Sequence, residues 1–211
     1  MDKNLVSIIE KKLDRTVKAL CKNRFEACVI HSREEMFAKL QELLPPGVSC
    51  SVGGSMTLFE TGVIDFLKNG EYTYLDRYAP GADIKQVFHD ALSCQVYITS
   101  ANAITETGEI YNIDATGNRV ASLVYGPEKV VIIAGQNKIV PDLSAARIRV
   151  QQVAAPANSV RLNKEELPCF HTGVCGDCNS SHRLCAYEVI CRYQSIPGRI
   201  TVLLLNESVG Y

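Results

Sequence analysis

The hydrophobic pattern along the chain alternates between helix-like and strand-like stretches. Apolar residues recur every three or four positions from Leu5 to Leu20, which predicts an amphipathic N-terminal helix over residues 1–23. Ser32 precedes a second helical stretch and is expected to cap it, with Glu35 three residues later as in a capping box. The same periodicity predicts further helices at residues 58–67, 84–92, 143–155 and 181–193.

Short apolar runs between these helices predict strands at residues 27–30, 48–52, 72–75, 95–99, 130–134 and 200–205. The run from Val130 to Ala134 is continuously apolar, which is typical of a strand buried on both faces. Two further runs, 110–114 and 120–125, flank a Gly-Asn turn signal and predict a hairpin. The alternation of strands and helices predicts a single α/β domain over residues 1–211, with a mostly parallel sheet flanked by helices.

Four polar stretches follow predicted strands, at residues 53–57, 100–108, 135–138 and 206–207. In open sheets of this kind, ligands bind beyond the carboxyl ends of the strands. We therefore expect the four stretches to lie along one edge of the sheet and to carry the binding residues.

The stretch Gly53-Gly54-Ser55-Met56-Thr57 joins a strand to a helix. Its glycines expose backbone N–H groups, the start of a helix favours an anion, and Ser55 and Thr57 add hydroxyls. The motif is neither a P-loop nor a dinucleotide fingerprint. The sequence favours a phosphate or carboxylate site here over a plain tight turn.

Glu106 lies beside Thr107 and Gly108 at the end of a strand, where a carboxylate can serve as nucleophile or general base. A solvated loop charge explains Glu106 equally well, and Lys138 has the same two interpretations as an anion ligand or a surface residue. The candidate ligand-binding residues are Gly53, Gly54, Ser55, Thr57, Thr105, Thr107, Gly108, Lys138, Asn206 and Glu207.

The chain contains nine cysteines, four of them between residues 169 and 185. Thiolates are the ligands of structural zinc and of iron–sulfur clusters. The predicted metal ligands are Cys169, Cys175, Cys178 and Cys185, whose spacing matches neither a common zinc finger nor a bacterial ferredoxin. The alternative is a set of reduced thiols that pack the cysteine-rich segment, residues 169–191, against the domain.

Within that segment, Cys191 is left out of the predicted ligand set, because on the expected helix it faces away from Cys185. His171 and His182 are alternative ligands, although a solvated histidine is the simpler interpretation.

The formal net charge of −1 provides no basic surface for nucleic acid. The charged N-terminal helix lacks the apolar core of a signal peptide, and no apolar run approaches the roughly 20 residues of a membrane span. We expect a cytoplasmic protein with reduced or metal-bound thiols and with neither nucleic acid nor membrane as a partner. A homo-oligomer is left open by the sequence.

Three motifs in combination resemble the LUD-domain (lactate utilization protein) family: residues 52–57 (VGGSMT), 103–108 (AITETG) and 135–140 (GQNKIV). The C-terminal runs 172–178 (TGVCGDC) and 206–211 (NESVGY) are similar to its single-domain, cysteine-containing branch. The resemblance implies a fold like that of the ribose-5-phosphate isomerase, glucosamine-phosphate deaminase and CoA-transferase group. It also implies a link to the oxidation of lactate, together with partner subunits that carry iron–sulfur clusters.

These observations support three hypotheses, and the sequence leaves open whether the protein is itself an enzyme. In the first, it supports the oxidation of lactate or a related small hydroxy acid and binds a small anionic metabolite at the strand ends. In the second, it is a transferase-like or isomerase-like enzyme for a phosphorylated or CoA-linked substrate. Glu106 would then act as in the similar glutamate–asparagine–glycine turn of CoA-transferases, although Thr107 replaces the asparagine. In the third, it is a non-catalytic metal-binding or redox-sensing subunit.

Overall fold

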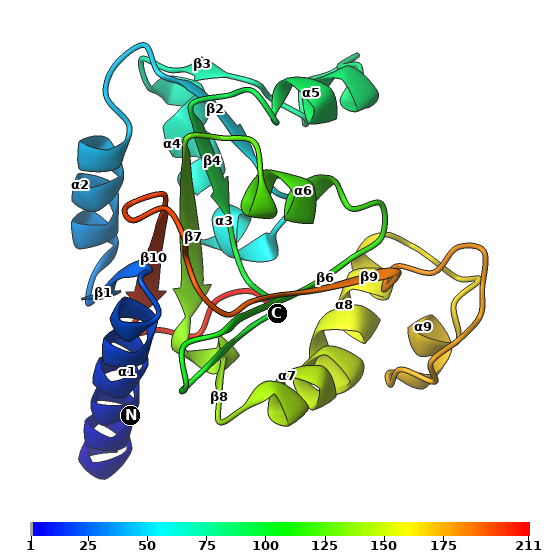
Figure 1. Cartoon of the computed structure of the whole chain (residues 1–211). Coiled ribbons are helices and arrows are strands. Elements are labelled where there is room, and N and C mark those ends of the chain that lie inside the picture. The colour runs from blue at the N-terminus through cyan, green and yellow to red at the C-terminus, as the bar shows by residue number, and fades with distance from the viewer. Residues whose placement is uncertain (1) are drawn as a thin grey trace.

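A computed structural model describes residues 2–211 and shows a central parallel sheet of six strands (Figure 1). In spatial order the strands are β1 (Glu26–Ile30), β10 (Ile200–Leu205), β7 (Lys129–Gly135), β4 (Val96–Thr99), β2 (Ser49–Val52) and β3 (Thr73–Tyr74). Every pairing between neighbours is parallel, so all six strands end at the same edge of the sheet. The predicted α/β fold with a parallel sheet flanked by helices is confirmed.

Helices cover both faces of this sheet because successive side chains of a strand point to opposite faces. Along β7, Val131 and Ile133 pack with α2 (Arg33–Leu43), α3 (Met56–Glu60) and α4 (Val63–Asn69) on one face. Val130 and Ile132 pack with α1 (Lys3–Lys22) and α6 (Asn118–Val124) on the other. The strand is thus buried on both faces, as its continuous apolar run predicts. A further helix, α5 (Ile84–Asp90), contains no buried residue.

A second, smaller sheet contains β8 (Ile139–Val140), β5 (Ala103–Thr105), β6 (Ile110–Asp114) and β9 (Tyr187–Cys191) in that order. β6 pairs antiparallel with both β5 and β9, whereas β5 and β8 are parallel. β5 lies within the polar stretch 100–108, and its three residues are all buried.

The predicted hairpin between residues 110–114 and 120–125 is wrong, because the second run forms helix α6. Gly117 adopts a left-handed conformation at the start of this helix (φ 82°). The carboxylate of Asp114 accepts hydrogen bonds from the backbone N–H groups of Arg119 and Val120, at 3.0 and 3.1 Å. These local contacts stabilise the first turn of a helix where a strand was expected.

The helix predicted at residues 181–193 is also wrong. Residues 187–191 instead form strand β9, which pairs with β6 over five residues. The helix predicted at 58–67 is present but is divided at Gly62, whose φ of 76° ends α3 and starts α4.

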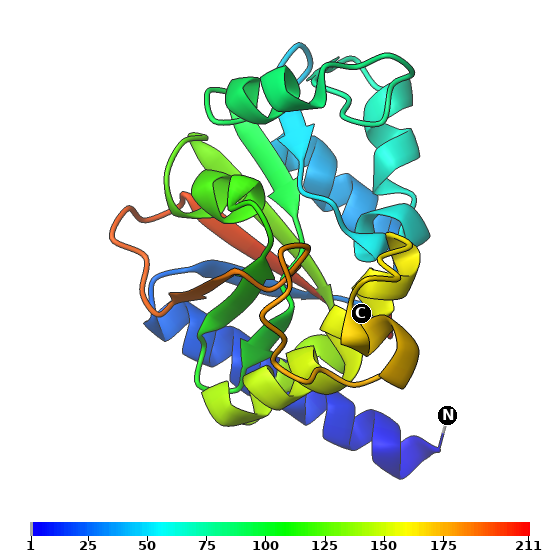
Figure 2. The same ribbon diagram turned by 90° about the vertical axis from the view of Figure 1, so that its right-hand side faces the viewer.

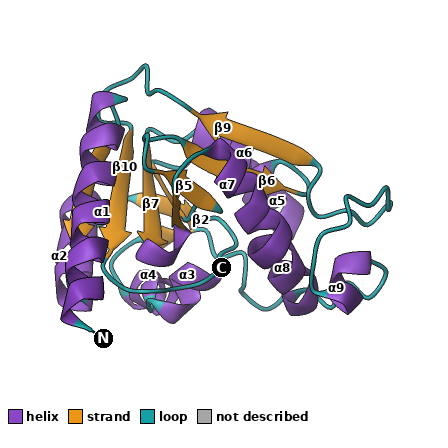
Figure 3. Ribbon diagram, turned by 90° about the horizontal axis from the view of Figure 1, so that it is seen from below, coloured by secondary structure: helices purple, strands orange, loops and turns teal. Residues whose placement is uncertain are grey.

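A long helical segment covers the second sheet. It consists of α7 (Leu143–Arg149), a π-helical turn (Val150–Ala154) and α8 (Ala155–Arg161), followed after a loop by α9 (Pro168–Thr172). Asp142 caps α7 by accepting from the N–H of Ala145 at 2.8 Å, so the predicted helix at 143–155 is confirmed and continues to Arg161. Figure 3 shows α1 and α2 at one side of the molecule and α8 and α9 toward the opposite side.

The C-terminus returns to the middle of the molecule and lies beside α8 (Figure 2). Across residues 2–211, the helices are all too short or too polar to cross a membrane.

Candidate anion-binding site

The ends of β2, β4 and β7 border a cavity of about 380 Å³, which α8 and the C-terminal Tyr211 close from the other side. Its volume is in the usual range for small-molecule sites. Five charged residues line it: Arg77, Asp114, Arg119, Lys138 and Arg161. Positive charge therefore exceeds negative charge around the cavity.

Lys138 lies in the short helical turn Gln136–Lys138 that follows β7, and its side chain is only 1% exposed. Its amino group donates to the hydroxyls of Thr57 (2.8 Å) and Ser100 (3.0 Å). Burial, together with the nearby charges of Arg149 and Arg119, lowers the pKa of Lys138 to about 7. Within residues 2–211, the Lys138 amine forms no ion pair with a carboxylate, although the charge of Glu60 acts on it from farther away and favours the protonated form.

Arg119 enters the cavity from α6 and is held in one place by its neighbours. Its guanidinium donates to the Asp114 carboxylate at 3.3 Å and to the side-chain oxygen of Asn102 at 2.8 Å. A further bond to the carbonyl of Ile113 completes the set. Asp114 is the carboxylate that lines the cavity, and it is already paired with Arg119. It therefore does not neutralise Lys138 or Arg161.

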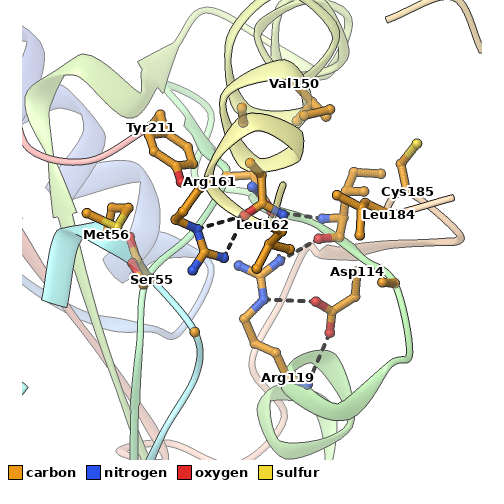
Figure 4. Close-up of a pocket in the computed structure, with 18 of the residues that line it drawn as sticks. Ser55, Met56, Asp114, Arg119, Val150, Arg161, Leu162, Leu184, Cys185 and Tyr211 are labelled. Carbon is orange, nitrogen blue, oxygen red and sulfur yellow. Dashed lines mark hydrogen bonds and ion pairs between the residues drawn. The ribbon is translucent and has the colours of Figure 1, made fainter. Parts of the chain in front are cut away.

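Arg161 reaches the cavity from α8, so that it and Arg119 point toward the middle of the cavity from two sides (Figure 4). It donates to the side-chain oxygen of Asn158 at 2.6 and 3.0 Å, and it adjoins the hydroxyl of Tyr211. In the described part of the chain, Arg161 has no carboxylate partner. The neutral amide leaves its charge free to attract an anion.

Arg77 borders the cavity from the loop after β3 and lies over the ring of Phe88, with 4.7 Å to the ring centre. This cation–π contact orients the guanidinium without neutralising it. The neighbouring backbone is that of Gly54, where a Cβ atom would lie 3.3 Å from Nη1 of Arg77. A side chain at residue 54 would therefore push the guanidinium of Arg77 away from this strand end by a few tenths of an ångström.

The residues of the glycine stretch 53–57 occupy different positions relative to the cavity. Gly54 and Ser55 line the cavity, whereas Gly53 packs so tightly that a Cβ there would lie 2.5 Å from Oγ1 of Thr99. The N–H of Gly53 donates to the carbonyl of Ile98, so it is not available to a ligand. Thr57 is fully buried and acts through its contact with Lys138.

The other candidates from the stretch 100–108 lie near α1, outside the cavity. Glu106 pairs with Arg15 of α1 at 2.7 Å. Thr105 and Thr107 both donate to the carboxylate of Glu109. Gly108 packs against α1, so that a Cβ there would lie 2.6 Å from the backbone of Ala19. A catalytic role for Glu106 remains a prediction that this geometry does not connect to the cavity.

Asn206 and Glu207 follow β10, on the far side of β7 from β4. The carboxylate of Glu207 pairs with Arg33 at 2.5 Å, and its carbonyl accepts from the N–H of Gln136 at 2.9 Å. Neither residue lines the cavity. Of the ten predicted ligand-binding residues, the structure places Gly54, Ser55 and Lys138 on the cavity wall.

Most of the charged and polar wall is absent from the candidate residues named from the sequence, although Asn102 falls within the polar stretch 100–108. These wall residues are Arg77, Asn102, Asp114, Arg119, Asn158, Arg161 and Tyr211. Arg77 follows β3 and Asp114 is the last residue of β6, so the rule that ligands bind at strand ends contained a signal for both. Arg161 and Tyr211 come from a helix and the chain terminus, and no local motif marks them.

All nine cysteines are free thiols. Cys169, Cys175, Cys178 and Cys185 line one small cavity of about 10 Å³, although residues 2–211 contain no group of three or more His, Cys, Asp or Glu that is arranged to hold a metal ion as it stands. Cys191 lies apart on β9 and packs against the main sheet's core.

The two histidines of the segment do not line this small cavity. His171 bonds the carbonyl of Glu165 at 2.7 Å, and His182 lies 3.7 Å from the carboxylate of Glu166.

Comparison with known proteins agrees with the fold. The LUD domain family model matches residues 13–205. The structure is similar to the crystal structure of a DUF162 family protein from Deinococcus radiodurans, with a TM-score of 0.57 and 14% sequence identity over 94% of this chain and 98% of that chain. No curated protein matches the sequence. The family match covers nearly the whole chain and confirms the resemblance seen in its motifs, so the chain belongs to the LUD-domain family.

Proposed function

We propose that this LUD-domain protein binds a small anionic metabolite, lactate or a related small hydroxy acid, in the 380 Å³ cavity and supports its oxidation. The observation that carries the proposal is the charge of the wall, where four cationic side chains face one carboxylate that is already paired. Of these cations, Lys138 is buried without a carboxylate partner, which is unfavourable for its charged form, and a bound carboxylate would relieve that cost.

The wall also provides the hydrogen bonds that such a ligand requires. The amino group of Lys138 and the guanidinium of Arg161 are donors for a carboxylate, and charge-assisted bonds of this kind are stronger than neutral ones. The hydroxyls of Ser55 and Ser100 can bond the 2-hydroxyl of the acid. Because the pKa of Lys138 is about 7, its amine can hold or accept a proton near neutral pH.

The alternative of a transferase or isomerase centred on Glu106 receives no support from this cavity. Glu106 lies against α1 with Arg15 as its partner, and it is not a lining residue. We therefore prefer the hydroxy-acid hypothesis, in which partner subunits with iron–sulfur clusters would accept the electrons.

Calorimetry tests the proposal with L-lactate, D-lactate, pyruvate and inorganic phosphate as ligands. We expect the parent protein to bind at least one of the carboxylates, and Arg161→Gln to weaken that binding roughly 10-fold or more, since a hydrogen bond to a charged group contributes about 1.5–3 kcal/mol. The matched control is Arg147→Gln, because Arg147 lies on the preceding helix but is exposed and paired with Glu188. No binding of any carboxylate, or equal binding by Arg161→Gln and the parent, would contradict the proposal.

A further inference from the structure

The amino group of Lys138 lies at the wall of the anion cavity and is held by two hydroxyl groups. It donates to Thr57 at 2.8 Å and to Ser100 at 3.0 Å, and Ser100 lines the cavity as well. Buried lysines are rare unless they are paired with a carboxylate. In the part of the chain that the structure describes, this lysine has hydroxyl partners in place of a carboxylate.

The hydrogen bonds at this amine match the donors of its neutral form. Thr57 donates to the carbonyl of Val209 at 3.4 Å, so its hydroxyl oxygen is free to accept from the amine. Ser100 lies 3.5 Å from the carbonyl of Ala101 and can do the same. Among the described residues, these two hydroxyls are the acceptors of the amine. The charged form has three N–H groups and leaves one without a protein acceptor, whereas the neutral amine uses both of its N–H groups and keeps a lone pair.

The charged groups that act on Lys138 come from three helices. Arg119 of α6 and Arg149 of α7 disfavour a further positive charge nearby, whereas Glu60 of α3 favours it. Burial is the largest influence, and the net result lowers the pKa of Lys138 to about 7. An appreciable fraction of the amine is therefore neutral at neutral pH. Lysines that are desolvated or lie beside other cations in this way can act as nucleophiles toward carbonyl carbons.

The cavity around this amine is suited to a small acid that also carries a carbonyl group. Arg161 and Arg119 point toward its middle from two sides (Figure 4). Arg161 has no carboxylate partner within residues 2–211, so it is available for the carboxylate of a ligand. The neutral amine provides a nucleophile for a ketone carbon in the same cavity. A 2-oxo acid carries both groups on neighbouring carbon atoms.

We propose that Lys138 is a nucleophile that forms a Schiff base with a small 2-oxo acid bound in the cavity. The lone pair of the amine attacks the ketone carbon, and a C–N bond forms while the carbonyl oxygen takes up a proton. The resulting carbinolamine then expels this oxygen as water, which carries away both amine protons, and a C=N bond remains. No oxidant or reductant is required. The hydroxyl of Ser100 contacts the amine and lines the cavity, so it is placed to pass a proton from nitrogen to oxygen.

This inference rests on the proposed function for the choice of acid, because the oxidation of a 2-hydroxy acid yields a 2-oxo acid. It adds a covalent step that lactate cannot undergo, since lactate has no carbonyl group to attack. The two protonation states of Lys138 would then serve different ligands. The ammonium form attracts the carboxylate of the hydroxy acid, and the neutral form reacts with the ketone of the 2-oxo acid.

The test is reductive trapping of the full chain with pyruvate and sodium cyanoborohydride, which reduces the C=N bond, followed by peptide mapping with mass spectrometry. We expect the peptide that contains Lys138 to gain the mass of pyruvate less its ketone oxygen. Labelling should saturate with pyruvate concentration, and Arg161→Gln should raise the half-saturating concentration roughly 10-fold. With the reductant in excess, the rate should rise by at most about tenfold per pH unit and level off above pH 7, as the amine becomes neutral.

Two lysine variants provide matched controls. Lys138→Arg should lose the label, because a guanidinium forms no Schiff base. Lys12→Arg should keep it, since Lys12 is also partly buried with a lowered pKa but does not line the cavity. Circular dichroism checks that both variants fold, and the peptide map of the parent gives the position of the label whether or not they do.

Three results would overturn the proposal: no adduct in the parent, an adduct spread evenly over several lysines, or equal labelling of the parent and folded Lys138→Arg. Calorimetry with lactate is scored separately. Lactate binding without a label on Lys138 refutes the Schiff base alone. A labelled Lys138 in a protein that binds neither form of lactate supports the Schiff base and removes the hydroxy acid from the proposed function.

Discussion

Two regions at strand ends are rich in charged residues, and they use that charge differently. In the anion cavity, Lys138 and Arg161 have no carboxylate partner within the described chain. In the glutamate turn, which we define as residues 105–109, Glu106 pairs with Arg15, and Glu109 lies 3.5 Å from Arg192. The turn also packs directly on α1 through Gly108, and none of its residues lines the anion cavity.

This contrast indicates which charged residues at the edge of a sheet are candidates for ligand binding. Partly exposed pairs such as Arg15–Glu106 contribute little to stability and have their counter-charge already in place. A lysine that is 1% exposed and has no carboxylate partner is unfavourable in its charged form, which is why burial lowers the pKa of Lys138 to about 7. The adjacent anion cavity is large enough for a metabolite, whose negative charge would stabilise the protonated amine. We therefore regard the cavity, and not the glutamate turn, as the candidate functional site.

The largest expected effect is the loss of anion binding in Lys138→Met. The substitution removes the buried amino group that donates into the cavity wall, and we expect carboxylate affinity to fall roughly 10- to 100-fold, in line with about 1.5–3 kcal/mol for a bond to a charged group. Lys39→Met is the control, because Lys39 is partly exposed and paired with Glu42. Calorimetric titration of both variants measures the effect, and an unchanged affinity in Lys138→Met would remove Lys138 from the site.

The pH dependence of binding is expected to be the next largest effect. A bound carboxylate favours the protonated amine, so affinity should be highest below the pKa of about 7 and should fall as the pH rises above it. The decrease should reach at most about tenfold per pH unit, which corresponds to one proton. Titrations between pH 6 and 8.5 should show this slope in the parent and a flat profile in Lys138→Met, whereas identical profiles would assign the pH dependence to another group.

A smaller loss of anion affinity is expected when Gly54 is replaced by a residue with a side chain. In Gly54→Val the new side chain would meet the guanidinium of Arg77, whose Nη1 lies 3.3 Å from a Cβ at this position. We expect affinity to fall roughly fivefold as Arg77 is displaced, corresponding to the lower end of overpacking costs of about 1–3 kcal/mol. Gly54→Ala provides the graded control with a smaller loss. Equal ligand-induced shifts in melting temperature for the parent and the valine variant would leave this stretch as a plain turn.

The smallest effect is expected at the glutamate turn. Glu106→Gln removes a partly exposed ion pair with Arg15, so the free energy of unfolding should change by less than about 1 kcal/mol and anion affinity should stay the same. Urea denaturation and calorimetry measure the two quantities. A loss of binding or turnover of about 100-fold in this variant would reverse the comparison and restore Glu106 as a catalytic acid or base.

Hydrophobic periodicity alone specifies the main sheet and several of the helices that cover it, but not α6, which was predicted as a strand. Each predicted strand of that sheet is present, and the N-terminal helix and the capped helix after Ser32 begin where the pattern predicts. These elements bury regular apolar faces, and burial is the property that a one-dimensional pattern records. The family is likewise readable from the sequence, because the motifs at residues 52–57 and 135–140 are contiguous in the chain.

Long-range packing, in contrast, produces the second sheet and the wall of the cavity. β9 forms where a helix was predicted because β6, far away in the chain, offers an unpaired edge. The change from strand to helix at α6 is instead local, because Asp114 accepts from the N–H groups of Arg119 and Val120. The cavity's cations come from a loop, two helices and a turn that are separated by 19 to 42 residues in the chain, as the positions of Arg77, Arg119, Lys138 and Arg161 show. Their proximity, and the absence of carboxylate partners for Lys138 and Arg161 within residues 2–211, depend on tertiary contacts that no local pattern encodes.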